Sequence, residues 1–156
     1  MRMGFRVARY LLVFLPAFAF ANSPDISPDV LARMNSQGIL IWVEAPKVQK
    51  VGDVFVVSIR LENWTTDPFK IEDVDLGAQY MNGFQLVEVS PRPSELDWSG
   101  GDLSMTYDRV VEPGNSFEMK LNVRAQRPGI YLGDVDVWFG LAQSYTRIAQ
   151  TRVLSQ

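Results

Sequence analysis

Two neighbouring runs between Pro113 and Trp138 constrain the fold of this chain most strongly. Each run is opened by a Pro-Gly step, and in each run apolar and polar residues alternate. In the first run one face carries Phe117, Met119, Leu121 and Val123, and the other carries Ser116, Glu118, Lys120, Asn122 and Arg124. Successive side chains of a β-strand point to opposite faces, so alternation with a period of two indicates a half-buried strand. The two runs predict a β-sheet protein and by themselves indicate no function.

Similar signals recur at steps of roughly 8–15 residues, a spacing typical of a β-sandwich or barrel. They predict about eight short strands, within residues 39–44, 54–63, 69–76, 84–89, 103–107, 116–124, 129–138 and 144–154. The apolar phase shifts near Glu72 and Asp73, which indicates a β-bulge. Residues 90–101 contain two prolines and two glycines, so we expect them to form the longest loop.

The first 21 residues have the layout of a secretory signal peptide. Arg2, Arg6 and Arg9 form a positive n-region, residues 11–20 form a short apolar core, and residues 19–21 form a small-x-small cleavage signal. The alternative is an uncleaved membrane anchor, but polar residues follow too soon for a span of about 20 apolar residues. We therefore expect cleavage, no stable membrane span afterwards, and a secreted, periplasmic or cell-surface protein.

Cleavage would remove three arginines and leave 12 basic and 18 acidic residues, a net charge of −6. This charge disfavours nucleic acid as a partner. Residues 22–37 are expected to form an N-terminal segment with a short helix, capped by Ser27 and ended by Gly38. Residues 38–156 are then expected to form one β-sandwich domain.

The chain contains no Cys and no His. This excludes Cys nucleophiles, His-based triads, and metal sites built on thiolate or imidazole. It also excludes disulfides, so the hydrophobic core must stabilise the fold alone. We accordingly predict no metal, no cofactor and no enzyme activity.

The segment Pro128-Gly129-Ile130-Tyr131-Leu132-Gly133 resembles the corner between strands E and F of immunoglobulin-like domains. Tyr131 occupies the position of the corner tyrosine, and Gly133 occupies that of the second Cys, so the usual disulfide is absent. Residues 51–63 resemble strand B of bacterial secreted immunoglobulin-like modules. Together with residues 84–91 they also resemble the opening of cohesin-type sandwiches.

This resemblance covers residues 38–154 and implies an all-β fold, an immunoglobulin-like antiparallel β-sandwich. Members of these groups act mostly in adhesion, assembly or carbohydrate binding. No partner-binding motif of theirs matches this chain, so the resemblance assigns no binding residue.

The candidate binding residues are large apolar side chains at positions expected to be exposed. Five fall on nominal outer strand faces and one in the predicted long loop: Trp42, Trp64, Ile130, Leu132, Trp138 and, in the loop, Trp98. They would serve as a stacking platform for sugar rings or as a protein-contact hot spot. The alternative is that they cover sheet edges or pack under the N-terminal helix. An outer face this apolar needs a cover, either internal or from a partner.

Two Asp-x-Asp pairs, Asp73/Asp75 and Asp134/Asp136, each place two carboxylates on one strand face. Carboxylates of this kind can bind Ca²⁺ or act as acid and base in glycoside hydrolysis. The pairs lack the loop, glycine and bidentate ligand of a dedicated calcium site, and nothing indicates a cleft, so a solvated face is expected. The glycosylation sequon Asn63-Trp64-Thr65 is interpreted as a chance match.

Together these observations predict a non-catalytic extracytoplasmic interaction module that binds a protein partner in adhesion or in assembly of a surface or envelope complex. The alternative is a carbohydrate-binding module whose exposed tryptophans stack on a polysaccharide. Both predictions rest partly on fold resemblance, and fold alone does not determine function.

Overall fold

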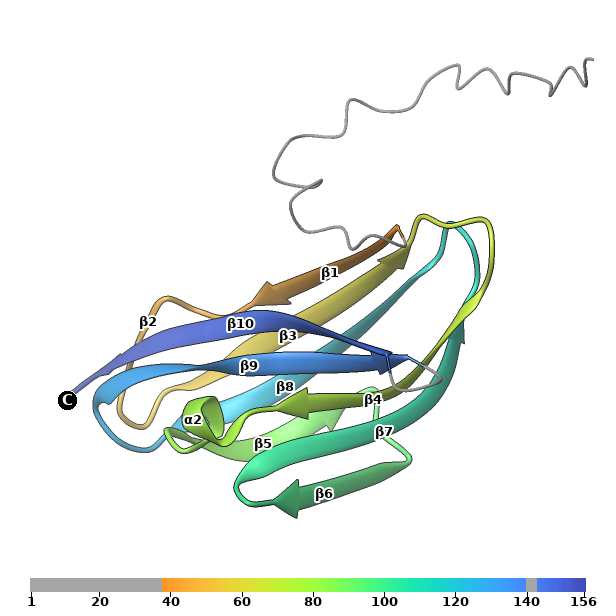
Figure 1. Ribbon diagram of the computed structural model, residues 1–156. Helices are drawn as coiled ribbons and strands as arrows, with labels where there is room; N and C mark the ends of the chain where they lie inside the picture. The colour runs from red at the N-terminus through yellow and green to blue at the C-terminus, as the bar shows by residue number, and fades with distance from the viewer. Residues whose placement is uncertain (1–37, 140–142) are drawn as a thin grey trace, which may run out of the picture.

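The computed structural model describes residues 38–139 and 143–156, and these form two β-sheets packed face to face (Figure 1). The strands are β1 (Ile39–Glu44), β2 (Val48–Lys50), β3 (Val54–Asn63), β4 (Phe69–Leu76), β5 (Phe84–Ser90), β6 (Glu95–Ser99), β7 (Asp102–Val111), β8 (Ser116–Ala125), β9 (Gly129–Phe139) and β10 (Gln143–Leu154). A single helical turn, α2 (Ala78–Met81), lies between β4 and β5. The predicted signal peptide and the predicted helix of residues 22–37 lie outside the described residues.

One sheet has four strands in the order β1-β3-β8-β5, and the other has six in the order β2-β10-β9-β4-β7-β6. All pairs are antiparallel except β2 with β10. The prediction of an all-β, immunoglobulin-like sandwich is confirmed. No helix among the described residues is both long enough and apolar enough to cross a membrane.

The inner faces of the two sheets form one hydrophobic core, as the alternation predicts. In β3, β8 and β9 the alternation puts one face in the core. Its buried residues are Phe55, Val57, Ile59, Leu61, Phe117, Met119, Leu121, Val123, Val135 and Val137. Tyr131, also expected to face inward, is half-buried against this core. The register of β4 shifts between Ile71 and Asp73, which confirms the predicted bulge. This bulge returns Val74 and Leu76 to the core side after Ile71.

The expected number of about eight strands is too low, because β2 and β6 were not predicted. Residues 90–101 are not one long loop: they contain β6, which forms a hairpin with the following strand β7. The prolines and glycines in this segment favoured a loop over a strand. The alternation in β6 covers only five residues, and none of them is buried. Trp98 therefore lies on an edge strand and not in a loop.

The corner predicted at Tyr131 is present. The Tyr131 hydroxyl donates a hydrogen bond to the Arg127 carbonyl oxygen at 3.0 Å, and its ring lies 5.0 Å from that of Phe84. At the Cys position, a Cβ on Gly133 would lie 2.7 Å from the backbone nitrogen of Tyr80 on α2. Gly133 thus lets α2 pack directly against β9, where Gly77 also donates to the Asp134 carbonyl at 2.9 Å.

Candidate functional site

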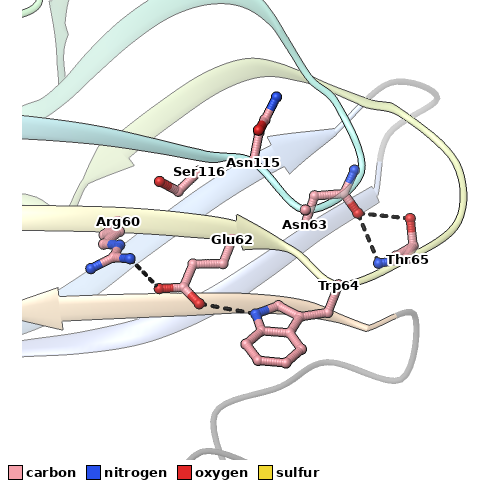
Figure 2. Close-up of a pocket in the computed structure, with 8 residues that line it drawn as sticks. Arg60, Glu62, Asn63, Trp64, Thr65, Asn115 and Ser116 are labelled. Atoms are coloured by element: carbon pink, nitrogen blue, oxygen red, sulfur yellow. Dashed lines mark hydrogen bonds and ion pairs between the residues drawn. The ribbon is translucent and has the colours of Figure 1, made fainter. Parts of the chain in front are cut away.

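The first candidate site is a hollow of about 390 Å³ beside Trp64, at the end of β3 (Figure 2). It is lined by residues of the β3 end and of the turn into β8: Arg60, Glu62, Asn63, Trp64, Thr65, Gly114, Asn115 and Ser116. Both segments belong to the four-stranded sheet, and the alternation of β3 points Arg60 and Glu62 to its outer face. The hollow therefore opens on the side away from the core.

The indole of Trp64 is held in place by a short chain of polar contacts. Its Nε1 donates to Oε2 of Glu62 at 2.9 Å, and Oε1 of Glu62 lies 2.7 Å from a guanidinium nitrogen of Arg60. Glu62 is largely buried, whereas Trp64 remains 46% exposed. An aromatic face is thus presented to solvent beside an oriented ion pair, an arrangement whose chemistry would allow stacking on a planar group.

The turn behind Trp64 is built on Asn63, which is buried. Its Nδ2 donates to the carbonyl oxygens of Asp67 at 2.9 Å and of Val111 at 2.8 Å. Its Oδ1 accepts from the amide of Thr65 at 2.9 Å and from the Thr65 hydroxyl at 2.7 Å. Because both amide hydrogens are used in the interior, Asn63 is not accessible as a glycosylation acceptor. This geometry supports interpreting the sequon as a chance match.

Trp42 lies on the same sheet face as Trp64. It pairs with Arg60 in the β1–β3 register and lines a neighbouring hollow of about 200 Å³ that also includes Glu62. The two hollows share Arg60 and Glu62, so the structure brings Trp42 and Trp64 to one surface. A third hollow of about 550 Å³, which includes Glu118 and Lys120, continues across this outer face.

The second candidate site is an apolar patch on the outer face of the six-stranded sheet, formed by Ile130 and Leu132 of β9 and Ile148 of β10. These side chains are 69%, 46% and 51% exposed, respectively. Leu132 faces Gln150, and Asp134 faces Ile148, so Leu132 and Ile148 are diagonal neighbours on the same face. We call these three residues the β9–β10 patch.

Trp138 shares the outer face of β9 but lies apart from the patch. It lies six positions after Leu132, a span of about 20 Å along a strand. Its indole Nε1 donates to Oδ2 of Asp75 on β4 at 2.7 Å, and the side chain is half-buried. Trp138 therefore covers the centre of the sheet and does not extend the patch.

Trp98 lies on a third surface. On β6 it pairs with Leu103, a core residue, so its side chain points to the inner side of the six-stranded sheet. It is nevertheless 46% exposed, because β6 is the outermost strand. The six predicted binding residues thus fall on three separate surfaces.

The paired carboxylates lie on the outer face of the six-stranded sheet, where Asp75 and Asp136 are cross-strand neighbours. Oδ1 of Asp73 accepts from the Thr106 hydroxyl at 2.6 Å, and Oδ1 of Asp136 accepts from the Thr146 hydroxyl. Within residues 38–139 and 143–156, no group of three or more acidic side chains is arranged to hold a metal ion.

Three residues that contribute to these surfaces were not predicted from the sequence. Arg60 and Glu62 lie two residues apart on one face of β3, and Trp64 continues this spacing just after the strand; this spacing was visible in the sequence. Ile148 lies in a strand with weak alternation, so its outward direction was not predicted.

No protein-family model and no curated protein sequence matches the chain. Among solved structures it is similar to a non-cellulosomal cohesin from the archaeon Archaeoglobus fulgidus, at 12% identity and a TM-score of 0.51, over 76% of this chain and 92% of that chain. An α2-macroglobulin from Salmonella is similar at 15% identity and a TM-score of 0.51, over 74% of this chain and 7% of that one.

A family 123 glycoside hydrolase from Clostridium perfringens is similar at 16% identity and a TM-score of 0.46, over 72% of this chain. The chain spans only 23% of that hydrolase. At these identities the likenesses concern the fold alone: the chain is a β-sandwich similar to cohesin-type sandwiches.

Proposed function

We propose that this chain is a non-catalytic interaction module that works outside the cytoplasm and binds a protein partner through the β9–β10 patch. The observation that carries the proposal is the exposure of Ile130, Leu132 and Ile148 side by side on two hydrogen-bonded strands. Exposed apolar side chains are ordinary when scattered, but a cluster on a flat sheet face is typical of a contact surface.

The surroundings of the patch favour a partner with basic groups around an apolar contact. Towards the sheet centre the outer face carries Asp134, Asp136, Asp75 and Asp73. Arg152, which pairs with Ile130, places a positive charge at the other end of the patch. Complementary charge would speed and orient the encounter, while burial of the three apolar side chains would supply most of the affinity.

The test is a binding experiment with patch and control variants. The immobilised domain would be exposed to an envelope extract of the source cell, and retained proteins identified by mass spectrometry. The double variant Ile130→Ser/Leu132→Ser should lose a retained protein while its unfolding midpoint stays within a few degrees of wild type. Val56→Ser, which alters an exposed apolar residue on the other sheet, should retain it.

Retention of the same proteins by wild type and by the patch variant would refute the proposal. Retention should also weaken as salt is raised to about 0.5 M, because screening shortens the reach of the surface carboxylates. Capture that is insensitive to salt would exclude a contribution of charge to partner binding and leave only the apolar contact.

Carbohydrate binding is a second candidate, favoured by the Trp64 hollow. The exposed indole and the oriented Arg60–Glu62 pair combine a stacking surface with hydrogen-bonding groups. Titration of a polysaccharide panel should then change the tryptophan fluorescence of wild type and of Trp98→Ala but not of Trp64→Ala. Trp98 is a matched control because the two tryptophans are equally exposed. No change across the panel, or an equal change in both variants, would reject this candidate.

A further inference from the structure

The edge strand β6 has an exposed backbone edge, which is separate from the candidate surfaces described above. It is the last of the described strands in the six-stranded sheet, and Figure 1 shows it at the outer edge beyond β7. All five of its residues are exposed. An exposed strand edge presents unpaired backbone N–H and C=O groups, which are a template for another strand.

The hairpin geometry determines which backbone groups are free. β6 and β7 are joined by Gly100 and Gly101, with φ of 62° and 96°, as a two-residue type I′ turn requires. In such a hairpin the flanking residues Ser99 and Asp102 form a hydrogen-bonded pair, and bonded pairs then alternate along the ladder. The N–H and C=O groups of Leu96 and Trp98 therefore point away from β7.

The inner side of β6 is apolar and open. Leu96 pairs with Met105 and Trp98 pairs with Leu103, and both partners are fully buried. Leu96 borders a hollow of about 520 Å³ between β6 and β5. On the β5 side this hollow is lined by Leu86, Val87 and Val89. A strand added beside β6 would place every second side chain over this hollow.

The outer side of β6 is acidic. Glu95 pairs with Thr106, and Thr106 pairs in turn with Asp73. Asp97 lies in the next row, which continues through Ser104 to Asp75. An added strand would have its outward side chains beside Glu95 and Asp97.

From these two sides we infer that β6 accepts an extended peptide in which basic and apolar residues alternate. The apolar side chains pack on Leu96 and Trp98, and the Lys or Arg side chains lie beside Glu95 and Asp97. The peptide completes the free hydrogen bonds of the edge, a mode of recognition known as β-strand addition. A second copy of the chain is a poor occupant, because antiparallel pairing of two β6 strands brings like charges together.

The neighbouring edge strand β5 is a less suitable template. Its register with β8 shifts between Leu86 and Glu88, and such a bulge bends an edge away from regular pairing. β6 has an unbroken register over its whole length. Both strands border the apolar hollow, but only β6 combines it with a regular edge.

The proposal is tested with a fluorescein-labelled synthetic peptide, Gly-Ser followed by four Lys-Val repeats, titrated with the domain and followed by fluorescence anisotropy. A peptide with the same composition but with its lysines and valines in two blocks is the control. The alternating peptide should bind at least about fivefold more tightly, because only it matches both sides of β6. Hydrogen exchange should show the amides of Leu96 and Trp98 protected on binding.

The decisive variant is Leu96→Pro. Proline removes an N–H that points to the free edge and leaves the β7 ladder intact, so the fold should persist with an unchanged unfolding midpoint. Affinity for the alternating peptide should fall by about fivefold or more through the lost hydrogen bond, the blocked edge and the lost contact with the Leu96 side chain. Val56→Ser, an exposed residue on β3 outside the hollow, and Ile130→Ser/Leu132→Ser should not change it, so a failure here is separable from a failure of the β9–β10 patch.

Equal binding of the two peptides would overturn the inference, because it would show a purely electrostatic contact. Unchanged affinity in Leu96→Pro would also overturn it. Sedimentation of the domain alone is the third measurement. Self-association that Leu96→Pro abolishes would show that a second copy, and not a basic peptide, occupies the edge.

Discussion

Tyr80 makes a buried hydrogen bond whose contribution to stability can be measured in full. It lies on α2 against Gly133, and its hydroxyl is 2.9 Å from Oγ1 of Thr151 on β10. Neither residue is exposed. Tyr80→Phe leaves the Thr151 hydroxyl buried without this partner, which should cost about 1–3 kcal/mol. Thr151→Val should cost a similar amount for the same reason.

The double variant Tyr80→Phe/Thr151→Val separates the hydrogen bond from packing. It removes both polar groups and keeps the shapes nearly constant, so its stability should lie within about 1 kcal/mol of wild type. Urea unfolding at pH 7, followed by tryptophan fluorescence, gives the four free energies of the cycle. A double variant as unstable as the sum of the single variants would refute the explanation, since the loss would then come from packing.

The same hydroxyl should make the free energy of unfolding depend on pH in the alkaline range. Burial raises the pKa of Tyr80 to about 12, against about 10 in the unfolded chain. Below pH 10 the Tyr80 hydroxyl is neutral in both the folded and the unfolded state, so the free energy of unfolding is at its full value. Between pH 10 and 12 only the unfolded state loses its proton, so wild type should lose roughly 2–3 kcal/mol over this range.

Tyr80→Phe lacks this loss, and the stability gap between it and wild type should therefore narrow as pH rises. Burial also raises the pKa of Tyr107 to about 12, but that residue is present in both proteins and cancels in the difference. Repeating the urea titrations from pH 8 to pH 11.5 measures the gap. A gap independent of pH would show that Tyr80 ionises in the folded state as easily as in the unfolded state.

Three further predictions concern the supports of the candidate surfaces, each measured by urea unfolding. Gly133→Ala should destabilise by about 1–3 kcal/mol, since its Cβ would overlap the α2 backbone; full stability would show that α2 moves freely. Asn63→Ala should cost about 2 kcal/mol, because it removes the hydrogen bond to the buried carbonyl of Val111, while Asn115→Ala, at the rim of the same hollow, should be nearly neutral. Tyr131→Phe should cost about 1 kcal/mol by removing the bond to Arg127, and a cost near zero would mean that solvent replaces this bond.

The core could be predicted from sequence because its strands alternate cleanly. Phe117 to Val123 and Phe55 to Leu61 each keep a period of two, which leaves only one face for the interior. Even the bulge in β4 was visible, as a change of phase after Ile71. These signals are local: each can be recognised within a single strand, without knowledge of which strands pair.

The candidate surfaces were less predictable, because alternation tells which residues face outward but not which sheet they belong to. Trp42 and Trp138 were both assigned to outer faces, and they lie on opposite sides of the sandwich. The strand order that separates them is set by long-range pairing, such as β4 with β9. β6 was missed because an edge strand buries little, so its short alternation resembles that of a loop.

The position of α2 links the stability of the fold to the proposed binding surface. Gly77 bonds to the Asp134 carbonyl, and Tyr80 packs against Gly133, so α2 supports β9 right after the patch residues Ile130 and Leu132. A patch on a rigidly supported strand loses little conformational entropy on binding, which favours affinity. Gly133→Ala should therefore weaken partner binding although every patch side chain remains. If its binding is equal to that of wild type, the patch does not depend on support from α2.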